Sequence, residues 1–195
     1  MKNIINKGTG AGGAKTNLLG KKFEDITNNE QRLIEKGFEM ININPKKFGY
    51  YLFKKYDNDN NKNEVIFFLQ SGLKFYIEKY YDIKIFRNPD EAYIIKYNNG
   101  KNILKILEKK EQNTEGSVET KLWSAPSLKR EYELLLGDKF EISYALCVND
   151  YLQNKFLSSH KKYVILNKIL KENNIPILFG DDSSYYENLD EWIYT

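Results

Sequence analysis

Cysteine and histidine are almost absent from this chain of 195 residues, which has one of each. One cysteine cannot build a disulfide framework, so a reducing compartment is expected. Cys147 lies in an apolar run, where a free thiol behaves as a small buried hydrophobe. His160 stands between serines and lysines and is expected to be exposed. The shortage of both residue types argues against zinc sites and nucleophilic triads, which need several such side chains.

Long hydrophobic runs are also missing, since none approaches the roughly 20 apolar residues that a membrane span needs. Residues 1–6 become polar too quickly for a signal peptide. We therefore expect a cytoplasmic protein without membrane association. The net charge is only +3, which does not by itself indicate nucleic-acid binding but permits a local basic cleft.

A substantial core is nevertheless expected, because 41% of the residues are hydrophobic and 14% are aromatic. The length predicts one domain over 1–195, with residues 1–20 as a Gly-rich N-terminal arm. Strands are expected at 40–43, 50–53, 64–69, 83–86, 92–97, 103–111, 141–148 and 175–179. Helices are expected at 20–37, 71–81, 124–136, 151–173 with a break near 158–159, and 185–193, and a connecting segment at 117–123. This interleaving predicts an α/β fold with a mixed central β-sheet flanked by helices.

The Gly-rich arm matches two nucleotide-binding motifs only superficially. Ala14 stands where a Walker motif needs a glycine before the Lys-Thr pair. The dinucleotide pattern at 8–13 lacks a convincing strand before it and a helix after it. Two interpretations remain: a disordered tail, or a flexible arm whose Lys15, Thr16 and Asn17 approach a phosphate backbone or groove.

Three charged residues form the most informative pattern in the chain. Asp90 follows a proline before one apolar run, and Glu108 and Lys110 end the next run after an Asn-Asn-Gly turn. Residues two apart on a strand share a face, so a hairpin would bring all three together. Two carboxylates suit a hard cation such as Mg²⁺, and the amine can orient water or offset charge at phosphorus. The alternative is a coincidence of surface charges in a chain with 29% charged residues.

The residues after Lys110 resemble a known family. The segment 110–122, KEQNTEGSVETKL, is similar to the stretch after the catalytic lysine in certain type II restriction endonucleases of the PD-(D/E)XK superfamily. Residues 10–24 and the C-terminal part resemble the same group, which includes homologues from large DNA viruses. The resemblance covers most of the chain and implies a restriction-endonuclease-like core. It also implies a bacterial cytoplasm or, for a viral protein, the host cell or virion.

The resemblance implies roles for individual residues. Asp90 and Glu108 match the metal-binding carboxylates, Lys110 the catalytic lysine, and Glu24 a helix-borne acid that supports the metal site. Composition alone would make Glu24 an ordinary solvated acid at a helix start. Lys109 would offer its backbone carbonyl. Further polar residues near the site are candidates for DNA binding: Gln112, Asn113, Ser117 and Lys121. The amides of Gln112 and Asn113 could equally read a base or lock the loop.

The expected activity is Mg²⁺-dependent, sequence-specific hydrolysis of double-stranded DNA. A homodimer is expected, because two copies can read both strands of a palindrome with one set of residues. A DNA methyltransferase acting on the same site would be its functional partner. The alternatives are a structure-specific repair or recombination nuclease on the same core, and a DNA-binding module that has lost catalysis.

Overall fold

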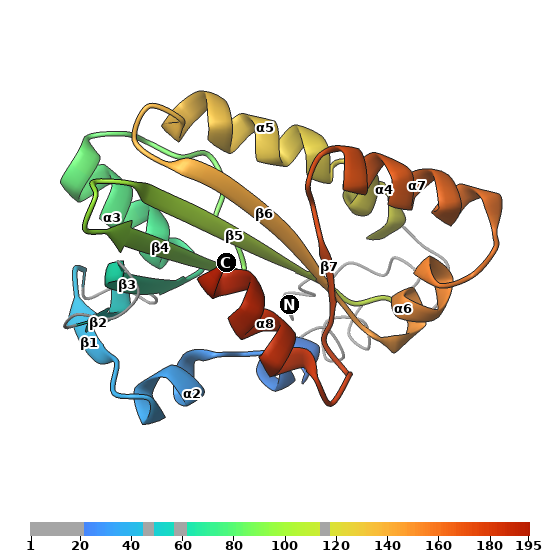
Figure 1. Ribbon diagram of the computed structural model, residues 1–195, viewed down its shortest axis with the longest axis horizontal. Coiled ribbons are helices and arrows are strands. Elements are labelled where there is room, and N and C mark those ends of the chain that lie inside the picture. Colours follow the sequence, from blue (N-terminus) through green and yellow to red (C-terminus); the bar gives the residue numbers. More distant parts are fainter. Residues whose placement is uncertain (1–21, 45–48, 57–61, 114–117) are drawn as a thin grey trace, which may run out of the picture.

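A seven-stranded mixed sheet forms the centre of the computed structural model, which describes residues 22–44, 49–56, 62–113 and 118–195 (Figure 1). The strands are β1 Glu39–Asn42, β2 Tyr50–Lys55, β3 Lys62–Leu69, β4 Glu91–Tyr97, β5 Asn102–Lys110, β6 Glu141–Val148 and β7 Ile177–Phe179. Their order across the sheet is their order along the chain. The predicted α/β class with a mixed, helix-flanked sheet is confirmed.

The direction of the strands changes at β5. The first five strands pair antiparallel, and β5, β6 and β7 pair parallel. The turn between β4 and β5 is closed by the Tyr97 N–H donating to the Lys101 carbonyl at 2.9 Å. Gly100 occupies the left-handed position of this turn, with φ +84°, as hairpin loops of this kind require. Parallel neighbours need longer crossovers, which the helices after β5 and β6 provide.

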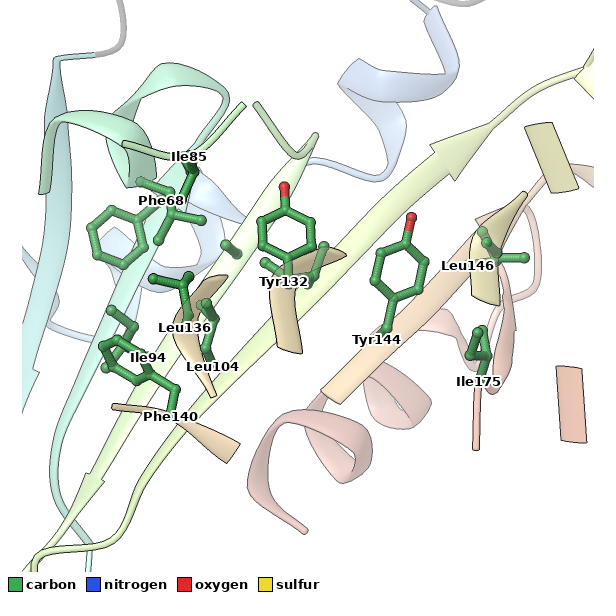
Figure 2. Packing of buried hydrophobic residues seen from close by; sticks show 14 of the residues in the cluster. Phe68, Ile85, Ile94, Leu104, Tyr132, Leu136, Phe140, Tyr144, Leu146 and Ile175 are labelled. Atoms are coloured by element: carbon green, nitrogen blue, oxygen red, sulfur yellow. The ribbon is translucent and has the colours of Figure 1, made fainter. Parts of the chain in front are cut away.

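Helices cover both faces of the sheet. One face carries α3 Ser71–Tyr81, α4 Val118–Trp123, α5 Ala125–Leu136, α6 Asp150–Phe156 and α7 Lys161–Glu172, whose apolar side chains share one buried cluster. Part of this cluster is shown in Figure 2. The other face carries α2 Glu30–Glu35, α8 Tyr185–Tyr194 and a helical turn at 22–26. In the described part of the chain, no helix combines the length and apolar character that crossing a membrane requires.

Alternation along β4 and β5 assigns side chains to the two faces. Ile94 and Ile106 enter the cluster beneath α3 to α7, whereas Tyr93 and Leu107 enter the cluster beneath α2 and α8. Because the side-chain period is two, Glu108 belongs to the first face and Lys109 to the second.

Three segments differ from the predicted elements. The helix expected over 20–37 is interrupted at 27–29. Thr27 still bonds to the Phe23 carbonyl of the first turn, but the N–H of buried Asn29 donates to Glu91 instead of continuing the helix. The segment 83–86 forms no strand, although its Ile85 is buried in the first cluster. Residues 118–123, expected as part of a connection, form α4, because buried Leu122 anchors a helical turn there. Cys147 is buried and His160 exposed, as predicted.

Candidate active site

Asp90, Glu108 and Lys110 converge at one end of the sheet. The Lys110 ammonium Nζ lies 2.7 Å from Glu108 Oε2 and 3.3 Å from Asp90 Oδ2. It also donates to the carbonyl oxygen of Lys109 at 3.0 Å. The structure therefore brings the two carboxylates and the amine of the predicted motif within reach of one another.

The hairpin explains this convergence. Asp90 immediately precedes β4, and Glu108 and Lys110 lie in the last three residues of its antiparallel neighbour β5. The start of one strand therefore lies beside the end of the other. The Lys109 N–H donates to Asp90 Oδ2 at 2.6 Å, which fixes the orientation of the Asp90 carboxylate.

The electrostatics of the site keep the amine charged. Burial alone would lower the pKa of Lys110, but Asp90 and Glu108 outweigh burial and hold that pKa above its ordinary value. Burial raises the pKa of Glu108, Lys110 counteracts this, and Asp90 adds to the increase. Two crowded carboxylates thus favour a bound cation, which lowers their mutual repulsion.

Two buried tyrosines that the sequence motif does not reveal lie within electrostatic reach of Glu108. Tyr132 of α5 and Tyr144 of β6 are 2% and 1% exposed. Figure 2 shows both hydroxyl groups pointing the same way. Burial and then the Glu108 charge raise the pKa of both. Both hydroxyls therefore stay protonated at neutral pH.

Glu24 lies on the helical turn at 22–26, which packs against the C-terminal part of the chain. A Cβ on Gly180 would lie 2.6 Å from the Phe23 ring and 2.7 Å from the Thr27 methyl, so this close packing requires glycine. Glu24 remains solvent-accessible. Partial burial and then the Asp90 charge raise its pKa, whereas Lys109 and Lys110 lower it. The structure therefore places Glu24 within the electrostatic reach of the site.

We expect Glu24→Gln to make the fold slightly more stable at pH 7 and to slow the DNA cleavage that the sequence predicts. A raised carboxyl pKa means that the folded state disfavours the charged form, so the stability associated with Glu24 is lost as the pH rises through that pKa. The gain in thermal midpoint should therefore disappear below about pH 4.

The cleavage rate of Glu24→Gln should fall about tenfold to a hundredfold and recover partly with more Mg²⁺. Asp25→Asn is the control and should leave the cleavage rate and its Mg²⁺ dependence unchanged. If the cleavage rate of Glu24→Gln depends on Mg²⁺ as the wild-type rate does, Glu24 is not part of the metal site.

A buried ion pair supports the site from the opposite face of the sheet. Lys109 Nζ lies 2.7 Å from Glu91 Oε1, and the two side chains are 3% and 0% exposed. Glu91 also accepts the Asn29 N–H at 3.1 Å and the Tyr93 hydroxyl at 2.7 Å. Lys109 donates to the carbonyl of Thr27 at 2.9 Å. These contacts tie the segment carrying Glu24 to the strands carrying Asp90 and Glu108.

We expect Lys109→Met to destabilise the fold by about 3 to 5 kcal/mol, because it leaves the Glu91 charge buried without its counterion. Adding Glu91→Gln should recover much of that loss, since the amide oxygen can still accept from Asn29. Denaturant unfolding measures both. Lys101→Met, which breaks an exposed pair with Glu141, is the control and should cost little. A Lys109→Met variant as stable as this control would contradict the structural role.

The loop after Lys110 is fastened to β6 and α6 by Asn149. Its amide accepts the Gln112 N–H at 3.3 Å and donates to the Gln112 carbonyl at 3.0 Å and to Asn113 Oδ1 at 3.3 Å. The Gln112 side chain is buried, so its contacts favour the loop-locking interpretation. Asn113 is exposed, and Lys121 is exposed on α4. Lys15, Thr16, Asn17 and Ser117, together with the N-terminal arm, lie outside the described residues.

The donor set fits a magnesium ion. Among the described residues, no three His, Cys, Asp or Glu side chains are grouped closely enough to hold a metal. Mg²⁺ does not require such a group, since proteins usually hold it with one or two carboxylates, and water and substrate phosphate complete its shell. Asp90 and Glu108 supply the carboxylates, and Lys110 shows that a cation is favoured between them.

Comparisons with known proteins add little to this geometry. No family model and no curated protein matches the chain. Among solved structures, the fold is similar to an XisH family protein from Nostoc punctiforme, with a TM-score of 0.37 and 14% identity over 80% of this chain and 88% of that one. The proposed function therefore rests on the site and on the sequence motif.

Proposed function

We propose that the protein is a Mg²⁺-dependent endonuclease that hydrolyses phosphodiester bonds of double-stranded DNA at a specific sequence, as type II restriction enzymes do. The observation that carries the proposal is the Lys110 ammonium within 2.7 Å of Glu108 and 3.3 Å of Asp90 at one end of the sheet. The three side chains are 14 to 27% exposed and share one half-buried cluster. This argues against a chance grouping of surface charges.

Asp90 and Glu108 would hold the metal, and the Lys109 carbonyl is a further oxygen donor at the same point. Bound there, Mg²⁺ would lower the pKa of a coordinated water and offset charge on the phosphate. The Lys109 N–H keeps the Asp90 carboxylate turned toward the site.

Lys110 acts mainly on the transition state. Its ammonium bonds to both carboxylates. When a metal and a phosphate occupy the site, the flexible side chain can turn Nζ toward a non-bridging phosphate oxygen. There it donates a hydrogen bond as negative charge accumulates in the transition state. Glu24, beside this cluster, can accept a hydrogen bond from ordered water.

Sequence specificity and a homodimer belong to the same proposal. A single small domain can make only a few base contacts, and a symmetric pair doubles them on a palindrome. Two copies also place one catalytic centre on each strand, which yields a double-strand break. A methyltransferase of matching specificity would protect host DNA and need not contact this protein.

Digestion of plasmid DNA tests the proposal. With Mg²⁺, wild-type protein should give discrete fragments, and sequencing their ends gives the site and the stagger. EDTA should stop cleavage, and Ca²⁺ should permit binding without cleavage. A smear or branch-dependent cutting would instead indicate a structure-specific nuclease, and binding without cleavage an inactive module. Sedimentation on the mapped duplex should show two copies per site, and one copy would refute the dimer.

A further inference from the structure

Gln70 has a backbone conformation that glutamine rarely adopts. Its φ of 43° and ψ of −114° lie near the values of about +60° and −120° at the second position of a type II′ turn, where glycine is normal. Such a conformation costs about 1 to 3 kcal/mol for a residue with a side chain, and it persists only where the surrounding structure imposes it. A glycine would have avoided that cost.

The other strained residues have ordinary explanations. Among the described residues, Asp82 and Asn174 are the remaining non-glycine residues with positive φ, at 56° and 52°. Both follow the end of a helix, α3 and α7 respectively, and both belong to the residue types that tolerate the left-handed region. Gln70 neither follows the end of a helix nor belongs to a residue type that tolerates positive φ. It precedes α3, yet its side chain does not cap that helix and is exposed to solvent.

Gln70 is also a direct neighbour of the candidate site. It follows β3, whose Leu69 pairs with Glu91 in the antiparallel register. The Gln70 N–H donates to the carbonyl of Asp90 at 3.4 Å. The end of β3, the start of β4 and the end of β5 therefore meet at one edge of the sheet. The exposed Gln70 is therefore bonded through its backbone to the residue whose carboxylate is proposed to hold the metal.

We propose that Gln70 is a substrate-positioning residue whose side-chain amide donates a hydrogen bond to a DNA phosphate beside the scissile one. This inference rests on the proposed nuclease function. The strain is retained because only a residue with a side chain can contact the substrate from this point. Asparagine would tolerate the backbone better, but its amide is one methylene shorter.

Three variants test the inference. Gln70→Gly removes strain and amide, Gln70→Ala removes the amide and keeps the strain, and Asn174→Gly relaxes a left-handed residue elsewhere. Gln70→Gly should raise the thermal midpoint by about 3 to 6 °C, and Gln70→Ala should not. Both should weaken binding of the plasmid-derived cleavage-site fragment in Ca²⁺ about tenfold. They should also raise KM in Mg²⁺ more than they lower kcat. Asn174→Gly should leave binding and cleavage unchanged.

Each other outcome overturns the inference. If Gln70→Gly is more stable and still binds DNA like the wild type, the strain serves no substrate contact. If Gln70→Gly is less stable, the conformation carries no strain that glycine relieves. If wild-type protein cleaves DNA and Gln70→Ala has the same KM and kcat, only the role of Gln70 fails. If wild-type protein neither binds nor cleaves DNA, the nuclease function fails together with this role.

Discussion

Replacement of Asp90 by asparagine or of Glu108 by glutamine is expected to abolish DNA cleavage while sparing DNA binding. Each change removes one of two carboxylates that lie within 3.3 Å of the same ammonium, and neutral amides bind Mg²⁺ poorly. Cleavage should fall by about 10³-fold or more. Loss of a negative charge should not weaken attraction to a polyanion. Single-turnover cleavage in Mg²⁺ and binding in Ca²⁺ measure the two effects separately.

The amide variants keep the shape of the site, so loss of activity cannot be attributed to a cavity. The amide oxygen that Asp90→Asn introduces can still accept the Lys109 N–H. Asp138→Asn, in the exposed turn after α5, is the matched control and should cleave at the full rate. Cleavage by either site variant at the wild-type rate, or weak binding in Ca²⁺, would contradict the assignment.

Lys110→Ala should slow the chemical step by about 10³-fold and leave DNA binding nearly intact. The ammonium bonds to both carboxylates in this structure, so its removal eliminates a competitor for the metal. The Mg²⁺ concentration needed for half-maximal residual activity should therefore stay the same or fall. A lysine needed only to assemble the metal site would instead raise that concentration.

Lys139→Ala, an exposed neighbour of the control aspartate, provides the matching loss of one positive charge. It should cleave at the wild-type rate. A Lys110→Ala protein with a near-wild-type single-turnover rate would remove the lysine from the mechanism. A protein that needs much more Mg²⁺ but then recovers fully would make Lys110 an assembly residue.

Much of the fold follows from local patterns in the sequence. The apolar runs on either side of Asn98-Asn99-Gly100 predict a hairpin, and the structure has that hairpin. The limits of α3 over 71–81 and of β6 over 141–148 coincide with the prediction. The spacing Glu-x-Lys then places Glu108 and Lys110 on one face by strand alternation alone.

Other features depend on residues that are distant in the sequence. The break at 27–29 exists because Glu91, 62 residues from Asn29, accepts its backbone N–H. Ile85 lies outside any strand, yet its side chain is buried in the cluster beneath α3 to α7. The sequence around Asn29 does not reveal Glu91, and the sequence around Ile85 does not reveal the cluster that buries its side chain.

The sequence by itself determined most of the strand and helix order, the hairpin and the charged triad at its end. These depend on side-chain periodicity and turn chemistry, which act over a few residues. Only the tertiary structure decided the buried Glu91–Lys109 pair, the two buried tyrosines within electrostatic reach of Glu108 and the strained Gln70 bonded to Asp90. Each depends on which strand or helix lies next to which. The free energy of such contacts comes from burial and long-range pairing, and local sequence patterns do not encode these.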